Sequence, residues 1–153
     1  MDRLTRLADH REFHALLAAL SGQERISLVL FDVDSVQALN DRYGHAEVDR
    51  FLARLGSLIQ ERCGAGEMGA RLGGDEFALS LLEDEPTEVI RQVEHIRRSF
   101  GEETAGATLS VGICEGRTLR RSSVQLSLLQ AADGALADAK EQGPGGLSFF
   151  RFE

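Results

Sequence analysis

Two short stretches in which apolar residues alternate with small or polar ones constrain the fold of this chain more than any other feature. Their apolar positions are Met68, Ala70 and Leu72 before a turn, and Phe77, Leu79 and Leu81 after it. Because successive side chains of a strand point to opposite faces, this period of two predicts paired β-strands. The turn, residues 73–76, reads Gly-Gly-Asp-Glu. We therefore expect a β-hairpin over residues 68–82 that carries functional groups at its tip.

An apolar segment upstream, residues 28–34, ends in the sequence Asp-Val-Asp. This pattern is typical of a buried strand that delivers acidic groups at its end. If that strand lies beside the hairpin, four carboxylates share one small volume, where their mutual repulsion is severe. These carboxylates belong to Asp32, Asp34, Asp75 and Glu76. Such a cluster calls for a cation, and hard oxygen ligands beside a phosphate suit Mg²⁺.

The two glycines of the turn complement this acidic cluster. Without side chains, Gly73 and Gly74 let backbone N–H groups approach phosphate oxygens that a Cβ atom would hold away. The hairpin and the acidic strand together predict a metal-dependent nucleotide site.

The other apolar patterns predict a helix over Glu12–Leu20, a strand over Ile26–Phe31, a long helix with an apolar stripe from Val48 to Ile59, a helix opened by Pro86, a strand over Thr108–Ile113, a helix over Ser123–Lys140 and a strand over Leu147–Phe152. The polar stretch 40–45 is expected to break the pattern before the long helix. The order α-β-α-α-β-β-α-β-α-β predicts an α+β fold, in which helices pack against a central, mainly antiparallel sheet.

Composition sets the outer bounds of the function. A chain of 153 residues with 42% hydrophobic content predicts one domain over residues 1–153, of which 1–24 form a leading segment and helix. A net charge of −8 argues against nucleic acid or anionic lipid as a partner. No apolar run approaches the roughly 20 residues of a membrane span, and no signal peptide is evident, so we expect a cytoplasmic protein. Cys63 and Cys114 form no close-spaced pair, and we assign them no role.

Several motifs in order resemble those of the GGDEF domains, the diguanylate cyclases. Residues 73–77 read Gly-Gly-Asp-Glu-Phe, the signature that names the family. The other blocks that match the family's pattern are Leu4-Thr5 with Leu7, Asp32-Val33-Asp34 with Asn40-Asp41, Gly44-His45 and Asp49, Thr108 to Gly112, and Ala132-Asp133 with Ala135-Leu136, Ala139-Lys140 and Gly143. Five ordered blocks at family spacing form a specific signal that covers essentially the whole chain.

The resemblance implies a palm-like α/β sandwich of the nucleotidyl-cyclase type that condenses two GTP molecules into cyclic di-GMP. Each subunit of an antiparallel dimer would hold one GTP, with Mg²⁺, or Mn²⁺ as an alternative. By match to the motifs, Asp32, the backbone carbonyl of Val33 and Asp75 would ligate metal, and Asp75 or Glu76 would help to deprotonate the attacking 3′-hydroxyl. The family match also implies that an upstream sensory or dimerising domain is missing from this chain.

The family match assigns the substrate contacts as well. Asn40 and Asp49 stand at the positions that read guanine, and an Asp accepts hydrogen bonds from the N1–H and N2–H₂ groups that adenine lacks there. The remaining positions that match substrate contacts are Gly73, Gly74 and Lys140. We weigh a structural role beside three of these functional roles. Asn40 can cap a turn, Asp49 is also a favourable first-turn helix acid, and Lys140 can be only a cation at a helix C-terminus.

Departures from the family pattern concentrate where the triphosphate is held. Gln37 stands where the family usually has Lys, and Pro144 where it usually has Arg, so two cationic contacts are missing. Ser35 and Val36 replace an aromatic pair, and Val48 replaces a glycine beside the base site. These changes favour an alternative function, a degenerate domain that binds GTP or a protein partner and regulates a neighbour.

A further departure concerns regulation. The product-inhibition motif Arg-x-x-Asp, which many members carry before the signature, is replaced here by Gly-Ala-Gly-Glu at residues 64–67. We therefore expect no feedback inhibition through that position.

Basic and histidine residues elsewhere are given structural roles. We expect Arg97 and Arg98 on a solvated helix face. His10 and His14 have helical spacing but no evident third metal ligand, so a solvated face is expected for them too. The cluster formed by Arg117, Arg120 and Arg121 is expected in a loop.

Overall fold

The computed structural model of the chain describes residues 1–19, 25–83, 85–117 and 122–151. Its centre is a five-stranded sheet with the strand order β2-β3-β1-β4-β5. The strands are β1 (Arg25–Val33), β2 (Met68–Arg71), β3 (Glu76–Leu81), β4 (Leu109–Arg117) and β5 (Leu147–Arg151). The helices are α1 (His10–Ala19), α2 (Val36–Tyr43), α3 (His45–Gln60), α4 (Pro86–Glu103) and α5 (Ser122–Glu141). The element order predicted from the sequence is confirmed.

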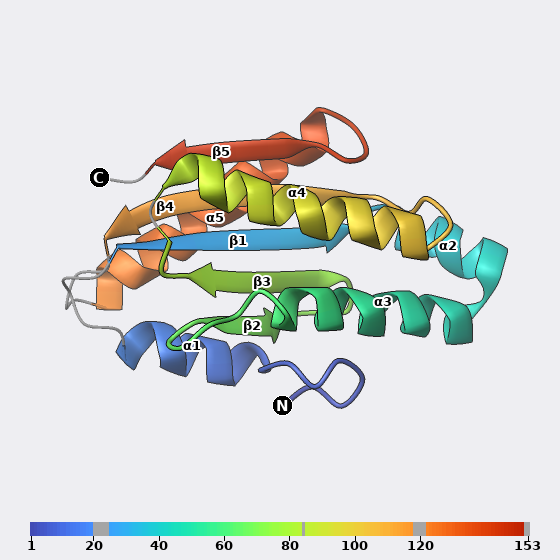
Figure 1. Cartoon of the computed structure of the whole chain (residues 1–153), viewed down its shortest axis with the longest axis horizontal. Coiled ribbons are helices and arrows are strands. Elements are labelled where there is room, and N and C mark those ends of the chain that lie inside the picture. Colours follow the sequence, from blue (N-terminus) through green and yellow to red (C-terminus); the bar gives the residue numbers. More distant parts are fainter. Residues whose placement is uncertain (20–24, 84, 118–121, 152–153) are drawn as a thin grey trace.

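Strand pairing makes the sheet mainly antiparallel, as predicted. The central strand β1 is antiparallel to both neighbours, β3 and β4, and β2 is antiparallel to β3 in the predicted hairpin. Among the five strands of the described residues, only the pair β4 and β5 is parallel, because α5 carries the chain back across the sheet between them. The acidic end of β1, the β2–β3 turn, α2 and the α5–β5 loop all lie at one end of the sheet (Figure 1).

Alternation along β1 explains why helices cover both faces of the sheet. Val29 and Phe31 enter one core with α3 and α4, while Leu28 and Leu30 enter a second core with α1 and α5. All four side chains are fully buried. Figure 1 shows α3 and α4 together in front of the sheet and α5 behind it. A strand with a continuous apolar run, residues 28–31, therefore occupies the centre of a three-layer fold.

Two glycines allow α5 to approach the sheet and the following loop closely. A Cβ atom at Gly112 in β4 would lie 2.2 Å from the backbone nitrogen of Leu136 in α5. A Cβ atom at Gly146 would lie 2.0 Å from the carbonyl oxygen of Ala139. The C-terminal half of α5 is thus fixed against β4 and the α5–β5 loop.

Several boundaries differ from those predicted. The polar stretch 40–45 does not break the pattern as a whole, because residues 40–43 complete α2 and the chain turns only at Gly44, where φ is +85°. Strand β1 continues to Val33 and β4 to Arg117, since both are paired along their length. Phe152, Arg120 and Arg121 lie outside the described residues, so the expectations for them stay predictions. Among the residues that the structure does describe, no helix is long and apolar enough to span a bilayer.

Candidate nucleotide and metal site

The end of β1 and the β2–β3 turn bring three of the predicted carboxylates together. Asp32 lies opposite Glu76 in the antiparallel register, and the Val33 N–H donates to the Asp75 carbonyl at 3.1 Å. The carboxylates of Asp32 and Asp75 are near enough for the Asp75 charge to raise the pKa of Asp32. The strand pairing therefore delivers the crowding that the sequence indicates, from two segments more than 40 positions apart.

Lys140 from the last turn of α5 neutralises part of this charge. Its ammonium forms an ion pair with the Asp32 carboxylate at Oδ2. Burial raises the pKa of Asp32, the Lys140 hydrogen bond opposes that shift, and the nearby Asp75 charge adds to it. The same contact raises the pKa of Lys140, which stays protonated. Lys140 therefore contacts the acidic cluster directly, in addition to being a cation near the C-terminus of α5.

One oxygen of Asp32 supports the predicted cation site. Oδ1 is buried and has no hydrogen-bond partner in the described part of the chain. A buried carboxylate oxygen without a partner is costly, and a metal ion would satisfy it. In the described ranges, no group of three or more His, Cys, Asp or Glu side chains is arranged to hold a metal ion by itself. Mg²⁺ needs no such cage, because it takes one or two carboxylates and fills its remaining positions with water and substrate oxygens. The residues present therefore fit a magnesium ion.

Glu76 lies in an environment that favours its protonated form. Burial raises the pKa of Glu76, and the negative charges of Asp133, Asp32 and Asp75 raise it further. Asp133, on α5, is a contributor that the sequence analysis did not single out as a site residue. Its signal is its spacing, because it precedes Lys140 by two helical turns and so shares a helix face with it.

The turn glycines have no evident role in the fold itself. Neither Gly73 nor Gly74 has a positive φ, and an added Cβ atom would meet nothing closer than 3.9 Å at Gly73 and nothing within 4 Å at Gly74. A bare backbone at this turn is therefore explained better by close approach of a ligand than by strain. The two amides are not equivalent, since the Gly73 N–H donates to the Glu76 carbonyl at 3.3 Å within the hairpin. Gly74 is the better placed of the two predicted phosphate donors.

The start of α2 adds a second set of backbone donors, which the sequence analysis did not identify. Ser35 precedes the helix with φ 55° and ψ 46°, a left-handed conformation that is uncommon outside glycine, and its side chain does not cap the helix. The first-turn N–H groups of α2 are therefore left for another acceptor, and a helix N-terminus favours an anion. Gln37, in this first turn, brings no charge, and its amide donates to Asp41 at 3.4 Å.

The predicted guanine-reading residues lie on the two helices that meet at Gly44. Asn40 is half-buried on α2 and its carbonyl accepts the Gly44 N–H, while Asp49 is exposed near the start of α3. No described contact joins either side chain to the carboxylate cluster. Val48, which replaces a family glycine beside the base site, packs in the core on the apolar stripe of α3 with 2% of its surface exposed.

Arg71 fixes the shape of the turn. Its guanidinium donates to the carbonyls of Gly73 at 3.1 Å and Gly74 at 2.7 Å. The same group lies 3.4 Å from the carboxylate of Asp2, which also accepts hydrogen bonds from the backbone and hydroxyl of Thr5 at 2.8 and 2.7 Å. The N-terminal segment therefore supports the hairpin tip through one arginine.

Asp34 does not join the carboxylate cluster as expected. Its carboxylate accepts hydrogen bonds from the hydroxyls of Thr108 at 2.7 Å and Ser110 at 2.6 Å and from the Gly145 N–H at 2.8 Å. Three donors satisfy its charge, so Asp34 ties β1 to β4 and to the α5–β5 loop. Arg97 also differs from expectation, because its side chain is only 19% exposed and contacts that same loop.

Glu67 stands at the position of the missing regulatory motif and has a structural role. Its two carboxylate oxygens accept the N–H groups of Gly64 and Leu82, both at 2.7 Å. This carboxylate closes the base of the hairpin and is already committed within the protein.

Comparison with known proteins agrees with these motifs. Residues 1–145 match the family model described as diguanylate cyclase, GGDEF domain. The chain is 31% identical over 154 residues to diguanylate cyclase VdcA from Vibrio cholerae, covering 93% of this chain and 44% of VdcA. It is 28% identical over 143 residues to the probable diguanylate cyclase DgcF from Escherichia coli K12, covering 88% of this chain and 45% of DgcF. The chain thus spans less than half the length of these relatives.

Solved structures show the same fold. The GGDEF domain of DgcB from Caulobacter crescentus, in complex with c-di-GMP, superposes with a TM-score of 0.84 at 26% identity, covering 97% of this chain and 92% of that chain. Diguanylate cyclase SiaD from Pseudomonas aeruginosa, in complex with its activator SiaC, superposes with a TM-score of 0.81 at 28% identity, covering 97% of this chain and 60% of that chain. The sheet and its helices therefore form the palm-like fold of nucleotidyl cyclases, and the chain belongs to the GGDEF domain family of diguanylate cyclases.

Proposed function

We propose that this domain condenses two GTP molecules into cyclic di-GMP with Mg²⁺, each subunit of an antiparallel dimer holding one GTP. The observation that carries the proposal is the environment of Asp32. It lies against Asp75, it is paired with a lysine, and it keeps one buried oxygen without a partner. Asp32 and Asp75 could therefore exchange the Lys140 ammonium for a metal ion that arrives with the triphosphate.

The chain's own residues would share the work of binding. The Gly74 amide and the first turn of α2 offer N–H donors to the phosphates. Lys140 supplies a positive charge to the triphosphate once metal replaces it at Asp32. Asp32, Asp75 and the Val33 carbonyl would hold the metal, which when bound stabilises negative charge at the α-phosphate during in-line transfer.

Proton removal from the attacking 3′-hydroxyl is assigned to Glu76 or Asp75. Burial and neighbouring charges raise the pKa of Glu76, which makes it a stronger proton acceptor than an ordinary glutamate. Asn40 and Asp49 would read the guanine from α2 and α3. Asp49 is exposed and therefore accessible to the donor edge of the base.

The second candidate is a GTP-binding or protein-interaction module without turnover. It is favoured by the small number of positive charges at the proposed triphosphate site. Gln37 and Pro144 carry no charge, and the charge of Lys140 is already paired with Asp32. Fewer cations weaken ground-state binding and transition-state stabilisation together.

Turnover in an enforced dimer separates the two candidates. The protein, fused to a dimerising coiled coil, is incubated with GTP and Mg²⁺, and cyclic di-GMP is measured by mass spectrometry. The same fusion with Asp75→Ala and Glu76→Ala tests the site, and Asp138→Asn on the exposed face of α5 serves as the control. Product from the parent and the control alone supports the cyclase. GTP binding without product in all three supports the module, and equal use of ATP contradicts the guanine assignment.

A further inference from the structure

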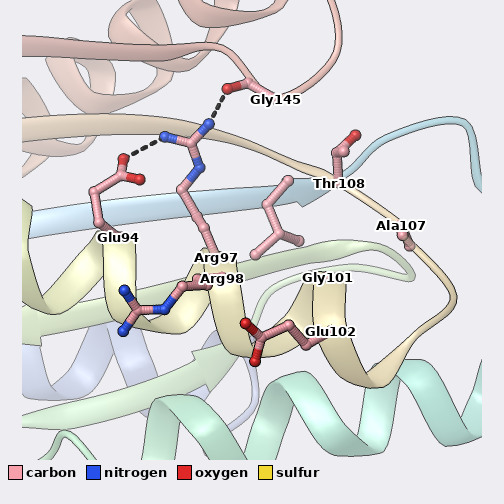
Figure 2. Close-up of a pocket in the computed structure, with 10 residues that line it drawn as sticks. Glu94, Arg97, Arg98, Gly101, Glu102, Ala107, Thr108 and Gly145 are labelled. Carbon is pink, nitrogen blue, oxygen red and sulfur yellow. Dashed lines mark hydrogen bonds and ion pairs between the residues drawn. The ribbon is translucent and has the colours of Figure 1, made fainter.

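Arg97 makes a contact that reaches the candidate site from another layer of the protein. It lies on α4, the helix that packs on the opposite face of the sheet from α5 and Lys140. Its guanidinium donates to the carbonyl of Gly145 in the α5–β5 loop and pairs with Glu94 at 2.5 Å. Figure 2 shows the Arg97 side chain extending from α4 to Gly145, while the guanidinium of Arg98 points away from it.

Gly145 links this arginine to the acidic end of β1. Its N–H donates to Asp34 at 2.8 Å while its carbonyl accepts from Arg97, so one residue bridges the two charged side chains. Its φ of +75° orients both groups at once. Asp34 follows directly on the Asp32–Val33 pair of the candidate metal site. On the other side, the loop begins two residues after Lys140.

We propose that Arg97 is a positioning residue for the nucleotide site, acting through the Gly145 peptide on Asp34 and on the loop that follows Lys140. This inference rests on the proposed function and deepens it. A site that must hold a metal and a triphosphate gains affinity when its supporting groups are already fixed before binding. The Arg97 contact fixes the α5–β5 loop from the side that α5 does not cover.

The surroundings of Arg97 make its removal a clean test. Its side chain lines an open cavity of about 410 Å³, together with Gly101, Thr108 and Leu109. Loss of the guanidinium therefore leaves no void in the packed core. Arg97→Met keeps most of the aliphatic stem and removes every donor, and Arg98→Met is the matched control on an exposed neighbour.

Three measurements on the parent and both variants test the positioning role of Arg97. The first two, made without nucleotide, are amide hydrogen exchange at Gly145 and the thermal midpoint Tm. The third is the affinity, measured by calorimetry with Mg²⁺, for a GTP analogue whose α and β phosphorus atoms are joined by methylene. For Arg97→Met we expect faster exchange at Gly145, an affinity about 3- to 10-fold weaker, and a Tm close to that of the parent. Arg98→Met should match the parent in all three.

Each other result has a definite meaning. An unchanged affinity in Arg97→Met, or an equal loss in Arg98→Met, overturns the positioning role and leaves the proposed function intact. Weaker binding with unchanged exchange at Gly145 also overturns it, because Arg97 would then act on the ligand directly. A parent protein that does not bind the analogue overturns the proposed function, and the positioning role with it.

Discussion

Lys140 on α5 forms an ion pair with Asp32 at the end of β1, across the junction between the helical layer and the sheet. The aspartate is mostly buried and the lysine is half-exposed, so the cation can leave while the carboxylate cannot. In the proposed function, Lys140 balances the charge of Asp32 before Mg²⁺ binds and turns to the triphosphate when Mg²⁺ binds Asp32 and Asp75.

Replacing Lys140 with methionine tests its role toward phosphate. A charge-assisted hydrogen bond contributes about 1.5–3 kcal/mol, so we expect GTP affinity to fall roughly 10- to 100-fold in Lys140→Met. Isothermal titration calorimetry measures it, with Lys140→Arg as the charge-conserving control. Unchanged GTP affinity in the methionine variant would show that Lys140 serves only to neutralise Asp32.

The raised pKa of Glu76 predicts an inverted pH dependence of stability. An acid whose pKa is higher in the folded protein than in the unfolded chain contributes its stability below the unfolded value, and that contribution is lost as pH rises through the folded value. Burial is the main cause of the raised pKa of Glu76, whose ordinary value is 4.5. In buffer with a metal chelator, we expect Glu76→Gln to have a higher Tm than the parent at neutral pH.

This difference in Tm should shrink as pH falls through the raised folded-state pKa of Glu76 and should be gone below about 4.5, because both proteins then carry a neutral side chain at this position. Differential scanning calorimetry from pH 4 to pH 8 provides the comparison. If the difference in Tm stays constant from pH 4 to pH 8, the charge on Glu76 is not the cause of the higher Tm of Glu76→Gln.

Glycine-to-alanine variants separate ligand binding from folding. Gly74→Ala meets no atom within 4 Å and has no positive φ, so we expect its free energy of unfolding to stay within about 1 kcal/mol of the parent. GTP affinity should nevertheless fall, because the new methyl group stands where phosphate oxygens would approach. In contrast, Gly112→Ala should destabilise the fold by about 3 kcal/mol or more, since its Cβ would lie 2.2 Å from the Leu136 nitrogen. Wild-type GTP affinity in Gly74→Ala would argue against a phosphate at this turn.

The commitment of Glu67 to two backbone amides predicts that cyclic di-GMP does not inhibit through this position. Titration of the isolated domain with cyclic di-GMP, followed by amide chemical shifts, tests this directly. Micromolar binding that perturbs residues 64–67 would refute it. Independently, Glu67→Ala should cost about 0.5–1.5 kcal/mol of stability, because it removes the acceptor of the exposed amides of Gly64 and Leu82, which water can then hydrate.

The elements of this fold were predictable because each has a strong local pattern. The period of two around the Gly-Gly-Asp-Glu turn gives the hairpin, and the continuous apolar run of β1 gives a central strand buried on both faces. The meeting of Asp32 with Glu76 follows once that strand pairs with the hairpin. No local sequence pattern shows which distant residues each polar side chain will contact in the folded protein.

Asp34 and Arg97 show which contacts cannot be predicted from the sequence. Asp34 looks equivalent to Asp32 in the sequence, yet the hydroxyls of Thr108 and Ser110 and the amide of Gly145 bind it away from the cluster. Arg97 shares a helix face with the buried Val93 and Phe100, whereas Arg98 is exposed. The sequence nevertheless does not place Gly145 beside Arg97. Such contacts depend on loops that meet across the sheet, so no periodicity predicts them.

A crystal structure of the protein with Mg²⁺ and the methylene-bridged GTP analogue would show whether Lys140 leaves Asp32 for the triphosphate. We predict a metal ion in contact with Asp32 and Asp75, the phosphates at Gly74 and the start of α2, and the Lys140 ammonium moved from Asp32 to the triphosphate. A nucleotide bound elsewhere, or one bound here while Lys140 still holds Asp32 and no metal lies between the carboxylates, would contradict it.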